Sequence, residues 1–377
     1  MTQGPPADLK MQRSSRDASA VPGLLADWLG TLLAPGADPT VVLHSGIDAN
    51  GMSSETLVLD ASWTEDGQPC GGEFVARVAP AAADVPVFPS YDLGDQYDVI
   101  RLVGERSCVP VPIVRWLEPT GDVLGTPFFL MDRVEGAVPP DVLPYNFGDN
   151  WLFDATPEEQ ETLQDSTVAA IAGLHSIPDV GATFGFLDPR RRGHAGATPL
   201  ARNVARTSAW YDFAVPDLGR SPMTERAIAW LKANVPETGE VVLCWGDSRI
   251  GNVVYRDFEP VGILDWEMAT LGPREHDVSW LVFAHMVFET ITGVLELPGM
   301  PDFLREADVK TTYESLTGAT LGDLAWFHVY NAVQWCIVFM RTGARQIHFG
   351  EIERPDDIES LMHHKALLER LLDEVGA

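Results

Sequence analysis

A short region of strand-like patterns interrupts a series of long helical patterns in the second half of the chain. Its segments, 241–244, 252–255 and 261–264, are rich in Val, Leu and Ile and are too short to be helices. The predicted helices around it are 157–175, 222–233, 273–288, 321–341 and 355–374. The chain must therefore place a small β island among helices, which is a restrictive arrangement.

The first third of the chain is different, because strand patterns dominate it. The predicted strands are 40–44, 56–63, 74–79, 113–117 and 127–131, and the predicted helices are 24–33 and 93–103. The first three strands are separated by turn residues and by no helical pattern, so we expect an antiparallel meander.

These two halves predict an α+β fold with two lobes. A chain of 377 residues exceeds what one hydrophobic core usually organises. We expect a flexible tail at 1–20, a small β-rich N-terminal lobe at 21–134 and a larger, mainly helical C-terminal lobe at 135–377. A cleft is expected at the junction of the lobes, with the β island facing it.

Composition narrows the classes of function. The chain has 55 acidic and 26 basic residues, for a formal net charge of −29. A surface this acidic repels nucleic-acid backbones and anionic lipid, so we expect no nucleic-acid partner and no membrane partner. The charge would favour a cationic substrate, or it serves solubility alone.

Cysteine usage and the N-terminus indicate where the protein works. The four cysteines are scattered, with no pair at zinc-ligand spacing, which fits a reducing compartment. The first twenty residues are polar and lack the apolar core of a signal peptide. We therefore expect a soluble, cytoplasmic protein.

The β island carries the strongest chemical signal. The loop between its first two strands reads Gly246-Asp247-Ser248-Arg249-Ile250-Gly251-Asn252, and its last strand leads into Asp265-Trp266-Glu267. Phosphoryl transfer needs a carboxylate that accepts the acceptor hydroxyl's proton, and oxygen ligands that hold magnesium on the phosphates. Asp247 suits the first task, and Asn252 with Asp265 suits the second.

These motifs resemble the aminoglycoside phosphotransferase and choline kinase family. The match is closest to a branch written Gly-Asp-x-Arg-x-x-Asn … Leu-Asp-Trp-Glu, whose members include phosphotransferase domains joined to acyl-CoA dehydrogenases. The resemblance implies a protein-kinase-like fold, the cofactors ATP and Mg²⁺, Asp247 as catalytic base, and Asn252 and Asp265 as magnesium ligands. In kinase-like enzymes a basic residue at the place of Arg249 reaches the transferring phosphate; a surface or acceptor-binding arginine is the alternative.

The N-terminal lobe should hold the nucleotide. The loop 46–55 resembles the family's glycine-rich loop, in which backbone N–H groups, helped by Ser53 and Ser54, approach phosphate oxygens. Arg77 lies in a strand that resembles the one whose Lys or Arg pairs with the α- and β-phosphates. A plain exposed arginine is the alternative.

The segment 125–136 resembles the hinge between the lobes. Adenine would bond to backbone groups there, and the resemblance assigns this contact to Met131, Asp132, Arg133 and Val134.

Two positions depart from the family pattern. Gln96 stands where the helix glutamate that pairs with the strand Lys or Arg is expected, and Asp95 or Asp98 is the alternative partner of Arg77. Trp245 stands where most relatives carry histidine, a change that we expect to affect packing rather than chemistry. We expect Asp277 to brace the catalytic loop.

The acceptor must be a small molecule with a hydroxyl group. An acidic, aromatic stretch follows the hinge, and it suits an aminated substrate or is a solvated loop. Its residues are Asp141, Tyr145, Asp149, Trp151 and Asp154. Both an aminoglycoside-like amino sugar and a hydroxyacyl-type metabolite stay open as acceptors. The rival functions are a nucleotide-binding pseudokinase that acts as sensor or scaffold, and a protein kinase.

Overall fold

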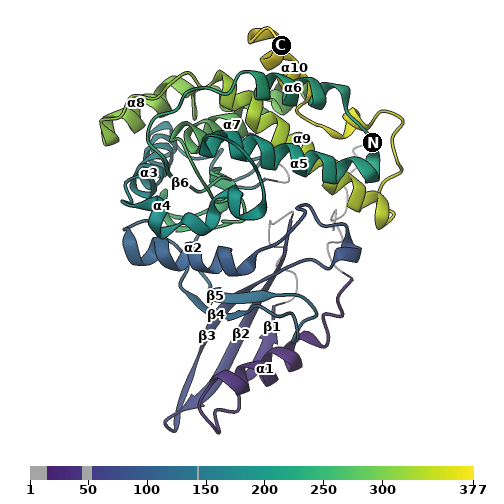
Figure 1. Ribbon diagram of the computed structural model, residues 1–377. Coiled ribbons are helices and arrows are strands. Elements are labelled where there is room, and N and C mark those ends of the chain that lie inside the picture. Colours follow the sequence, from purple (N-terminus) through teal and green to yellow (C-terminus); the bar gives the residue numbers. More distant parts are fainter. Residues whose placement is uncertain (1–14, 45–52, 142–143) are drawn as a thin grey trace, which may run out of the picture.

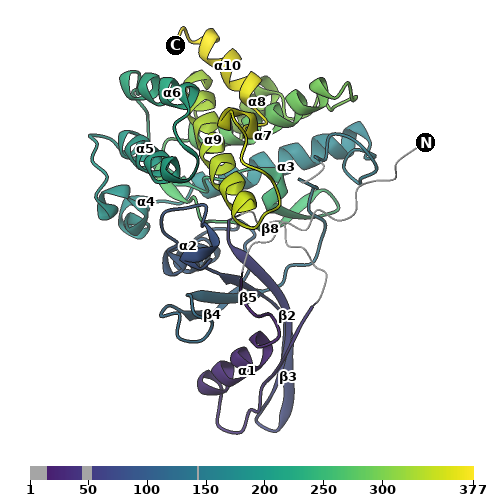
Figure 2. The same ribbon diagram turned by 90° about the vertical axis from the view of Figure 1, so that its right-hand side faces the viewer.

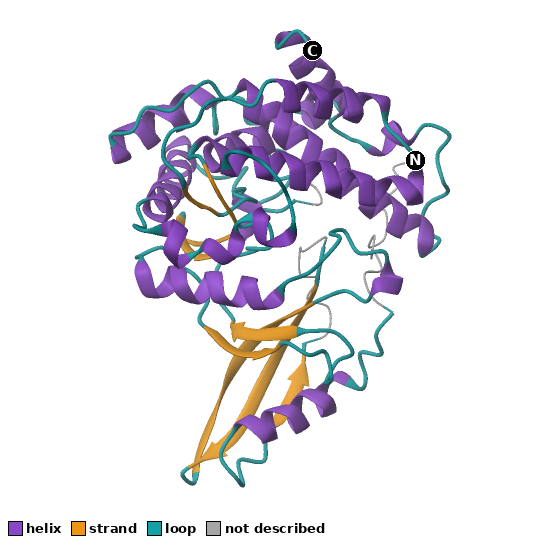
Figure 3. Cartoon of the chain, in the orientation of Figure 1, coloured by secondary structure: helices purple, strands orange, loops and turns teal. Residues whose placement is uncertain are grey.

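The computed structural model describes residues 15–44, 53–141 and 144–377. Figure 1 shows a strand-rich lobe below a larger helical lobe, and Figure 3 shows the same division by secondary structure. The predicted α+β class and two-lobed, kinase-like architecture are confirmed.

The small lobe is built on one antiparallel sheet with the strand order β1-β2-β3-β5-β4. Its elements are α1 (Val21–Leu32), β1 (Thr40–Leu43), β2 (Glu55–Glu65), β3 (Gln68–Val78), α2 (Leu93–Arg106), β4 (Val114–Glu118) and β5 (Phe128–Asp132). A two-residue turn, Asp66-Gly67, joins β2 to β3, and both of its residues have positive φ, as such hairpin turns require. The predicted meander is therefore present, with longer second and third strands than the sequence pattern indicated.

Two hydrophobic clusters divide the N-terminal elements. Helix α1 inserts Val21, Leu25 and Leu29, one turn apart, against the inner residues of the sheet. Helix α2 instead buries Val99 and Val103 in the large cluster of the helical lobe. Figures 1 and 2 accordingly show α1 beside the sheet, and Figure 1 shows α2 between the sheet and the helical lobe.

The residues before α1 were predicted to be a flexible tail. Residues 1–14 lie outside the described residues. Within the part that is described, Arg16 donates from Nε to Glu55 Oε2 at 2.9 Å and from Nη2 to Thr126 Oγ1 at 2.9 Å. This segment therefore contacts the sheet lobe.

The large lobe contains the helices and a split β island. Its helices are α3 (Pro157–His175), α4 (Val180–Thr183), α5 (Pro199–Leu218), α6 (Pro222–Ala233), α7 (Glu275–Val294), α8 (Glu306–Thr317), α9 (Ala325–His348) and α10 (Lys365–Glu374). Its strands are β6 (Val242–Cys244), β7 (Val253–Arg256), β8 (Glu259–Ile263) and β9 (Thr270–Gly272). They form two antiparallel pairs, β6 with β9 and β7 with β8, so the island is two small sheets rather than one.

Local sequence explains where several helices begin. Thr156, Thr198 and Ser221 each accept a backbone hydrogen bond at the N-terminus of a helix, and a proline follows each of them at the first helical position. The sequence analysis missed α5 and α8. It also placed the start of the last helix at residue 355, whereas α10 begins at Lys365.

No helix in the described part of the chain is both long enough and apolar enough to cross a membrane.

Candidate active site

The loop between β6 and β7 is held in a tight turn. Gly246 has φ +93°, and a Cβ there would collide with the backbone of Met268, so this position requires glycine. The buried carboxylate of Asp277 accepts the N–H groups of Trp245 and Gly246, each at 2.8 Å. The loop that carries Asp247 is therefore fixed by a side chain from α7.

Asp277 is itself anchored by a buried network. His175 Nε2 lies 3.0 Å from Asp277 Oδ2, and His175 Nδ1 lies 2.8 Å from the hydroxyl of Tyr313. Burial alone would raise the pKa of Asp277, but the hydrogen bonds and charge of His175 outweigh burial, and the pKa lies below its ordinary value. Asp277 stays ionised and braces the loop, as the sequence predicted.

Both carboxylate oxygens of Asp247 accept hydrogen bonds. Trp280 Nε1 donates to Oδ1 at 2.7 Å, and Asn252 Nδ2 donates to Oδ2 at 2.7 Å. Arg249 Nε adds a contact of 3.1 Å. These three donors fix the plane of the carboxylate, and the Asn252 amide is turned so that its nitrogen, rather than its oxygen, faces Asp247.

Arg249 joins two carboxylates in the site. Its guanidinium pairs with Asp141 as well as with Asp247, and its side chain is 11% exposed. Burial lowers the pKa of Arg249, but the two carboxylates outweigh burial, so the pKa lies above its ordinary value. A Cβ at Gly251 would overlap the Asp141 carboxyl group, so Gly251 is needed for Asp141 to reach the loop.

Asp265 lies at the turn after β8 with φ +58°, an uncommon conformation for a residue other than glycine. Arg77 Nη2 donates to Asp265 Oδ1 at 2.8 Å. Trp245 Nε1 donates to the backbone oxygens of Leu264 at 2.8 Å and Asp265 at 3.2 Å. Trp245, which stands where most relatives are expected to carry histidine, therefore braces the turn at Asp265. This agrees with a role in packing rather than in chemistry.

Glu267 completes the charged cluster. Ser53 Oγ donates to Glu267 Oε2 at 2.5 Å, and Arg77 Nη2 lies 3.7 Å from the same oxygen. Burial and the neighbouring Asp265 raise the pKa of Glu267 to about 8. Burial also raises the pKa of Asp265, although Arg77 opposes it.

This cluster fits a divalent cation. Four carboxylates, on Asp141, Asp247, Asp265 and Glu267, are paired with only two guanidinium groups, on Arg77 and Arg249. Carboxyl groups therefore outnumber guanidinium groups in a buried region, and burial first, then the neighbouring carboxylates, raises the pKa of Asp265 and of Glu267. Carboxylate and amide oxygens are the ligands that Mg²⁺ prefers.

Two cavities meet at Asp265. One, of about 260 Å³, lies between the sheet and the β island, and the other, of about 430 Å³, extends into the helical lobe. Asp265 lines both. We call the first the nucleotide-side cavity, after the nucleotide that the sequence predicts for the small lobe. We call the second the apolar cavity, because hydrocarbon side chains form most of its walls.

The predicted site residues fall into these two cavities. The nucleotide-side cavity is lined by Arg77, Met131, Asp132, Arg133, Val134, Asn252 and Asp265. Ser53, Asp247 and Arg249 line the apolar cavity. Ser54 is buried, and within the described residues its hydroxyl has no partner. Most of the predicted glycine-rich loop, residues 46–52, lies outside the described residues.

The helix partner of Arg77 differs from the alternatives that the sequence left open. Asp95 pairs with Arg192 at 2.5 Å, and Asp98 pairs with Arg101 at 3.0 Å. Gln96 lines the nucleotide-side cavity together with Arg77. Neither aspartate of α2 therefore takes the missing role, since Arg77 pairs with Asp265 and Glu267.

Of the acidic, aromatic stretch after the hinge, Asp141 alone lines the apolar cavity. Tyr145 is buried and bonds to His285, and Trp151 packs on Tyr255 and Phe258. The side chains of Asp149 and Asp154 are exposed. Asp141 is therefore the one of the five named residues that lines the cavity, and Pro144 and Phe147 of the same segment line it as well.

The walls of the apolar cavity were missed from the sequence. Most of them come from two helices, with Trp280, Phe288 and Ile291 on α7, Leu295 directly after it, and Trp335, Val338, Phe339 and Thr342 on α9. The α9 residues follow the spacing i, i+3, i+4 and i+7, which signals an apolar helix face but does not distinguish a cavity wall from core packing.

Comparisons with known proteins agree with this geometry. The model of the phosphotransferase enzyme family matches residues 61–299. A protein named as an acyl-CoA dehydrogenase in Arabidopsis thaliana is 33% identical over 230 residues, which are 56% of this chain and 26% of that protein. Acyl-CoA dehydrogenase family member 10 of mouse is 30% identical over 215 residues, 56% of this chain and 18% of that protein. The chain thus corresponds to a minor part of each relative.

Solved structures share the fold at low sequence identity. A candidate aminoglycoside phosphotransferase from Ralstonia eutropha has a TM-score of 0.62 at 19% identity, covering 93% of this chain and 96% of that one. An ethanolamine kinase from Plasmodium vivax has a TM-score of 0.54 at 9% identity, covering 88% and 81%. Since the family model spans more than half of the residues, the chain belongs to the phosphotransferase enzyme family.

Proposed function

We propose that this protein transfers the γ-phosphoryl group of ATP, in a magnesium-dependent reaction, to a hydroxyl group of a small molecule. The observation that carries the proposal is the position of Asp247. Its carboxylate is held by hydrogen bonds from Trp280, Asn252 and Arg249, and it lines the apolar cavity beside the other carboxylates of the charged cluster. Residues 21–134 would clamp the nucleotide, and residues 135–377 would carry the catalytic groups and bind the acceptor.

The nucleotide-side cavity has the groups that ATP requires. Arg77 presents a guanidinium fork for phosphate oxygens, and Asn252 and Asp265 offer oxygen ligands to a magnesium ion bound there. At the hinge, the N–H groups of Asp132 and Arg133 are already donated to Ile113 and Glu73. Within the described residues the Val134 N–H has no acceptor, so it is the donor that we assign to the adenine edge.

Asp247 can act as general base in the transfer. The acceptor hydroxyl gives its proton to the Asp247 carboxylate as its oxygen attacks the γ-phosphorus, and ADP leaves with the electrons of the broken P–O bond. A magnesium ion would neutralise charge on the phosphates. Arg249, held between Asp141 and Asp247, adds positive charge beside the reacting oxygen.

The lining of the apolar cavity favours the hydroxyacyl-type acceptor over the amino sugar. Its acidic groups all belong to the charged cluster, where Arg249 and Arg77 pair with them. No additional carboxylate of the described residues lines the cavity to bind several ammonium groups. Leu295, which is 56% exposed, extends the apolar wall to the surface. An acceptor with a hydrocarbon portion matches these walls, since apolar area is stabilised there.

The names of the relatives are consistent with this choice. The Arabidopsis and mouse proteins are named for acyl-CoA dehydrogenases, which connects this type of domain to acyl metabolism in those proteins. The structural neighbours named for aminoglycosides and ethanolamine are under 20% identical, so they support the fold alone.

Two other functions fit the site less well. A nucleotide-binding pseudokinase, acting as sensor or scaffold, is suggested by the departures at Gln96 and Trp245, but the chain keeps Asp247 and both proposed magnesium ligands. A protein kinase needs an activation segment that docks a peptide, and α7 begins at Glu275, ten residues after Asp265.

The test is acceptor-dependent ADP release from Mg-ATP, with mass spectrometry of the acceptor. Hydroxyacyl thioesters and aminoglycosides form the two arms, and Asp247→Ala is the inactive control. We expect a phosphorylated acceptor that appears with the wild type alone. If ATP binds but no acceptor in either arm is phosphorylated above the level of Asp247→Ala, the pseudokinase is the better account.

A further inference from the structure

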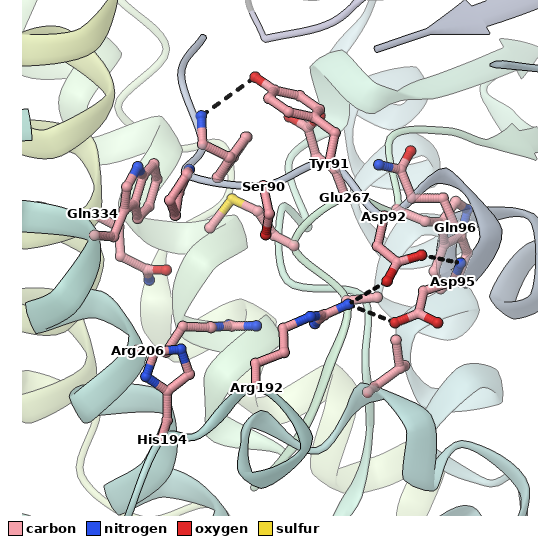
Figure 4. Close-up of a pocket in the computed structure, with 17 residues that line it drawn as sticks. Ser90, Tyr91, Asp92, Asp95, Gln96, Arg192, His194, Arg206, Glu267 and Gln334 are labelled. Carbon is pink, nitrogen blue, oxygen red and sulfur yellow. Dashed lines mark hydrogen bonds and ion pairs between the residues drawn. The ribbon is translucent and has the colours of Figure 1, made fainter. Parts of the chain in front are cut away.

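A third cavity, of about 110 Å³, lies beside the active site without being part of it. Figure 4 shows it between the first turn of α2, the helix α5 and the helix α9. Glu267 lines both this cavity and the apolar cavity, and Gln96 lines both this cavity and the nucleotide-side cavity. Phe88 and Trp210, stacked at 4.7 Å, form an apolar wall. The phosphoryl-transfer chemistry proposed above uses none of this space.

One wall of the third cavity carries a cation without an acidic partner. Arg206 reaches into it from α5 (Figure 4). Its neighbours are the hydroxyl of Tyr330, to which it hydrogen-bonds, and the cation of Arg192. Within the described residues no carboxylate forms an ion pair with Arg206. Burial lowers the pKa of Arg206, and Arg192 adds to this effect, as expected for a guanidinium whose charge lacks a counterion.

A second donor points into the same space. Gln334, on α9, is 1% exposed, and within the described residues its Nε2 has no acceptor. In Figure 4 its amide lies beside the Arg206 side chain and faces the cavity. A buried N–H group without an acceptor is destabilising, because it has lost its hydrogen bonds to water. Gln334 and Arg206 are therefore both placed to donate hydrogen bonds to an acceptor bound in this cavity.

The acidic groups of the opposite wall are already engaged. Arg192 pairs with Asp95 at 2.5 Å and with Asp92 at 3.4 Å, as Figure 4 shows. Glu267 accepts a hydrogen bond from Ser53 and lies near Arg77 outside this cavity.

Two further titratable groups line the cavity, and of these Tyr91 stays neutral because burial raises its pKa; the other is His194. Its pKa is lowered, first by burial and then by the charges of Arg206 and Arg192, so the ring is mainly neutral at pH 7. Arg206 is therefore the guanidinium of this lining that makes no ion pair within the described residues, because Arg192 takes both Asp92 and Asp95.

We propose that the third cavity is a binding site for a small monovalent oxyanion, a carboxylate or a phosphate, received by the Arg206 guanidinium and the Gln334 amide. A water molecule needs roughly 10–15 Å³ of such space, so the cavity holds an ion the size of acetate or phosphate. Pro89 and Ser90, both exposed, line its opening to solvent. A carboxylate, with one negative charge, matches the one unpaired guanidinium better than a phosphate dianion does, since Asp92 and Asp95 also line the cavity.

The test is calorimetric titration of the full chain with acetate and, in a parallel arm, inorganic phosphate. Saturating Mg-ADP is present, so that acetate and phosphate cannot bind in the nucleotide-side cavity. We expect binding by the wild type and affinity weaker by about tenfold or more in Arg206→Met, because a charge-assisted hydrogen bond is lost. Tighter binding of acetate would identify a carboxylate ligand, and tighter binding of phosphate would identify a phosphorylated one.

A second variant keeps the test valid if Arg206→Met does not fold. Gln334→Glu has nearly the same shape but places a carboxylate beside Arg206, where it competes with the anion, so affinity should fall again. Arg226→Met, on an exposed position of α6, is the matched control and should bind as the wild type does. The proposal is wrong if the wild type binds neither anion, or if both cavity variants bind as tightly as the control.

Discussion

The nucleotide-side cavity and the apolar cavity meet at one residue, Asp265, yet they are built in different ways. The first is lined mainly by strands of the sheet and of the β island, and it combines apolar side chains such as Phe129 with polar ones such as Arg77 and Asn252. The second is lined by the faces of two long helices, α7 and α9, with aromatic and aliphatic side chains. Under the proposed function, the nucleotide would occupy the first cavity and the acceptor the second, so differences among relatives in their acceptors should appear in the walls of the second.

The largest expected effect comes from the residue at the boundary. Asp247→Asn keeps the shape but removes the base and the charge that Arg249 neutralises, so kcat should fall about a thousandfold or more while nucleotide affinity changes little. Steady-state kinetics with calorimetric ADP binding measure both. Asp302→Asn, on an exposed loop, is the control. A loss of less than about tenfold in kcat would contradict the assignment of Asp247 as base.

The next effect should be confined to the nucleotide side. Arg77→Met removes the guanidinium that would pair with phosphate and with Asp265, so kcat/KM for ATP should fall about a hundredfold. Arg77→Lys should recover part of this loss, because an ammonium keeps the charge but not the fork. Arg101→Met, on the outer face of α2, serves as control. Equal KM values for ATP in Arg77→Met and wild type would remove Arg77 from the nucleotide site.

A smaller effect should be confined to the acceptor side. Val338→Asp places a carboxylate in the wall of the apolar cavity, so KM for an apolar acceptor should rise about tenfold while KM for ATP stays unchanged. For a polycationic acceptor the same change should lower KM instead. Val294→Asp, which is 75% exposed and outside the cavity lining, is the matched control. The direction of the change in KM therefore distinguishes the two acceptor classes.

The smallest effect is expected at the position that departs from the family. Gln96→Glu restores an acid at the predicted place on α2, but Arg77 already pairs with Asp265 and Glu267. We expect KM for ATP to change by about threefold at most, since Gln96 and Arg77 are both buried and the desolvation of a further carboxylate offsets the added ion pair. A tenfold gain in kcat/KM would mean that the helix partner is missing in the native protein.

The sequence predicts the charged cluster better than it predicts the walls of the cavities. Each of the two motifs, around Asp247 and around Asp265, is a short run of consecutive residues. Glycines and carboxylates at this spacing have few other uses, so the sequence predicts the fold and most of the charged cluster. Trp335 and Phe339 belong to a helix face like any core-facing one, and nothing in their spacing indicates an empty volume beside them. Arg206 and Gln334 are far apart in the sequence, and tertiary packing alone brings them together.

The central claim is that an acceptor with a hydrocarbon portion receives the phosphoryl group at Asp247. The most direct measurement is kcat/KM for a series of hydroxyacyl thioesters in which the apolar chain is lengthened and the hydroxyl position is kept. Burying one CH₂ group stabilises a complex by about 0.8 kcal/mol, so kcat/KM should rise about fourfold per CH₂ until the apolar cavity is filled. A series with no dependence on chain length, or a higher kcat/KM for aminoglycosides, would contradict the account.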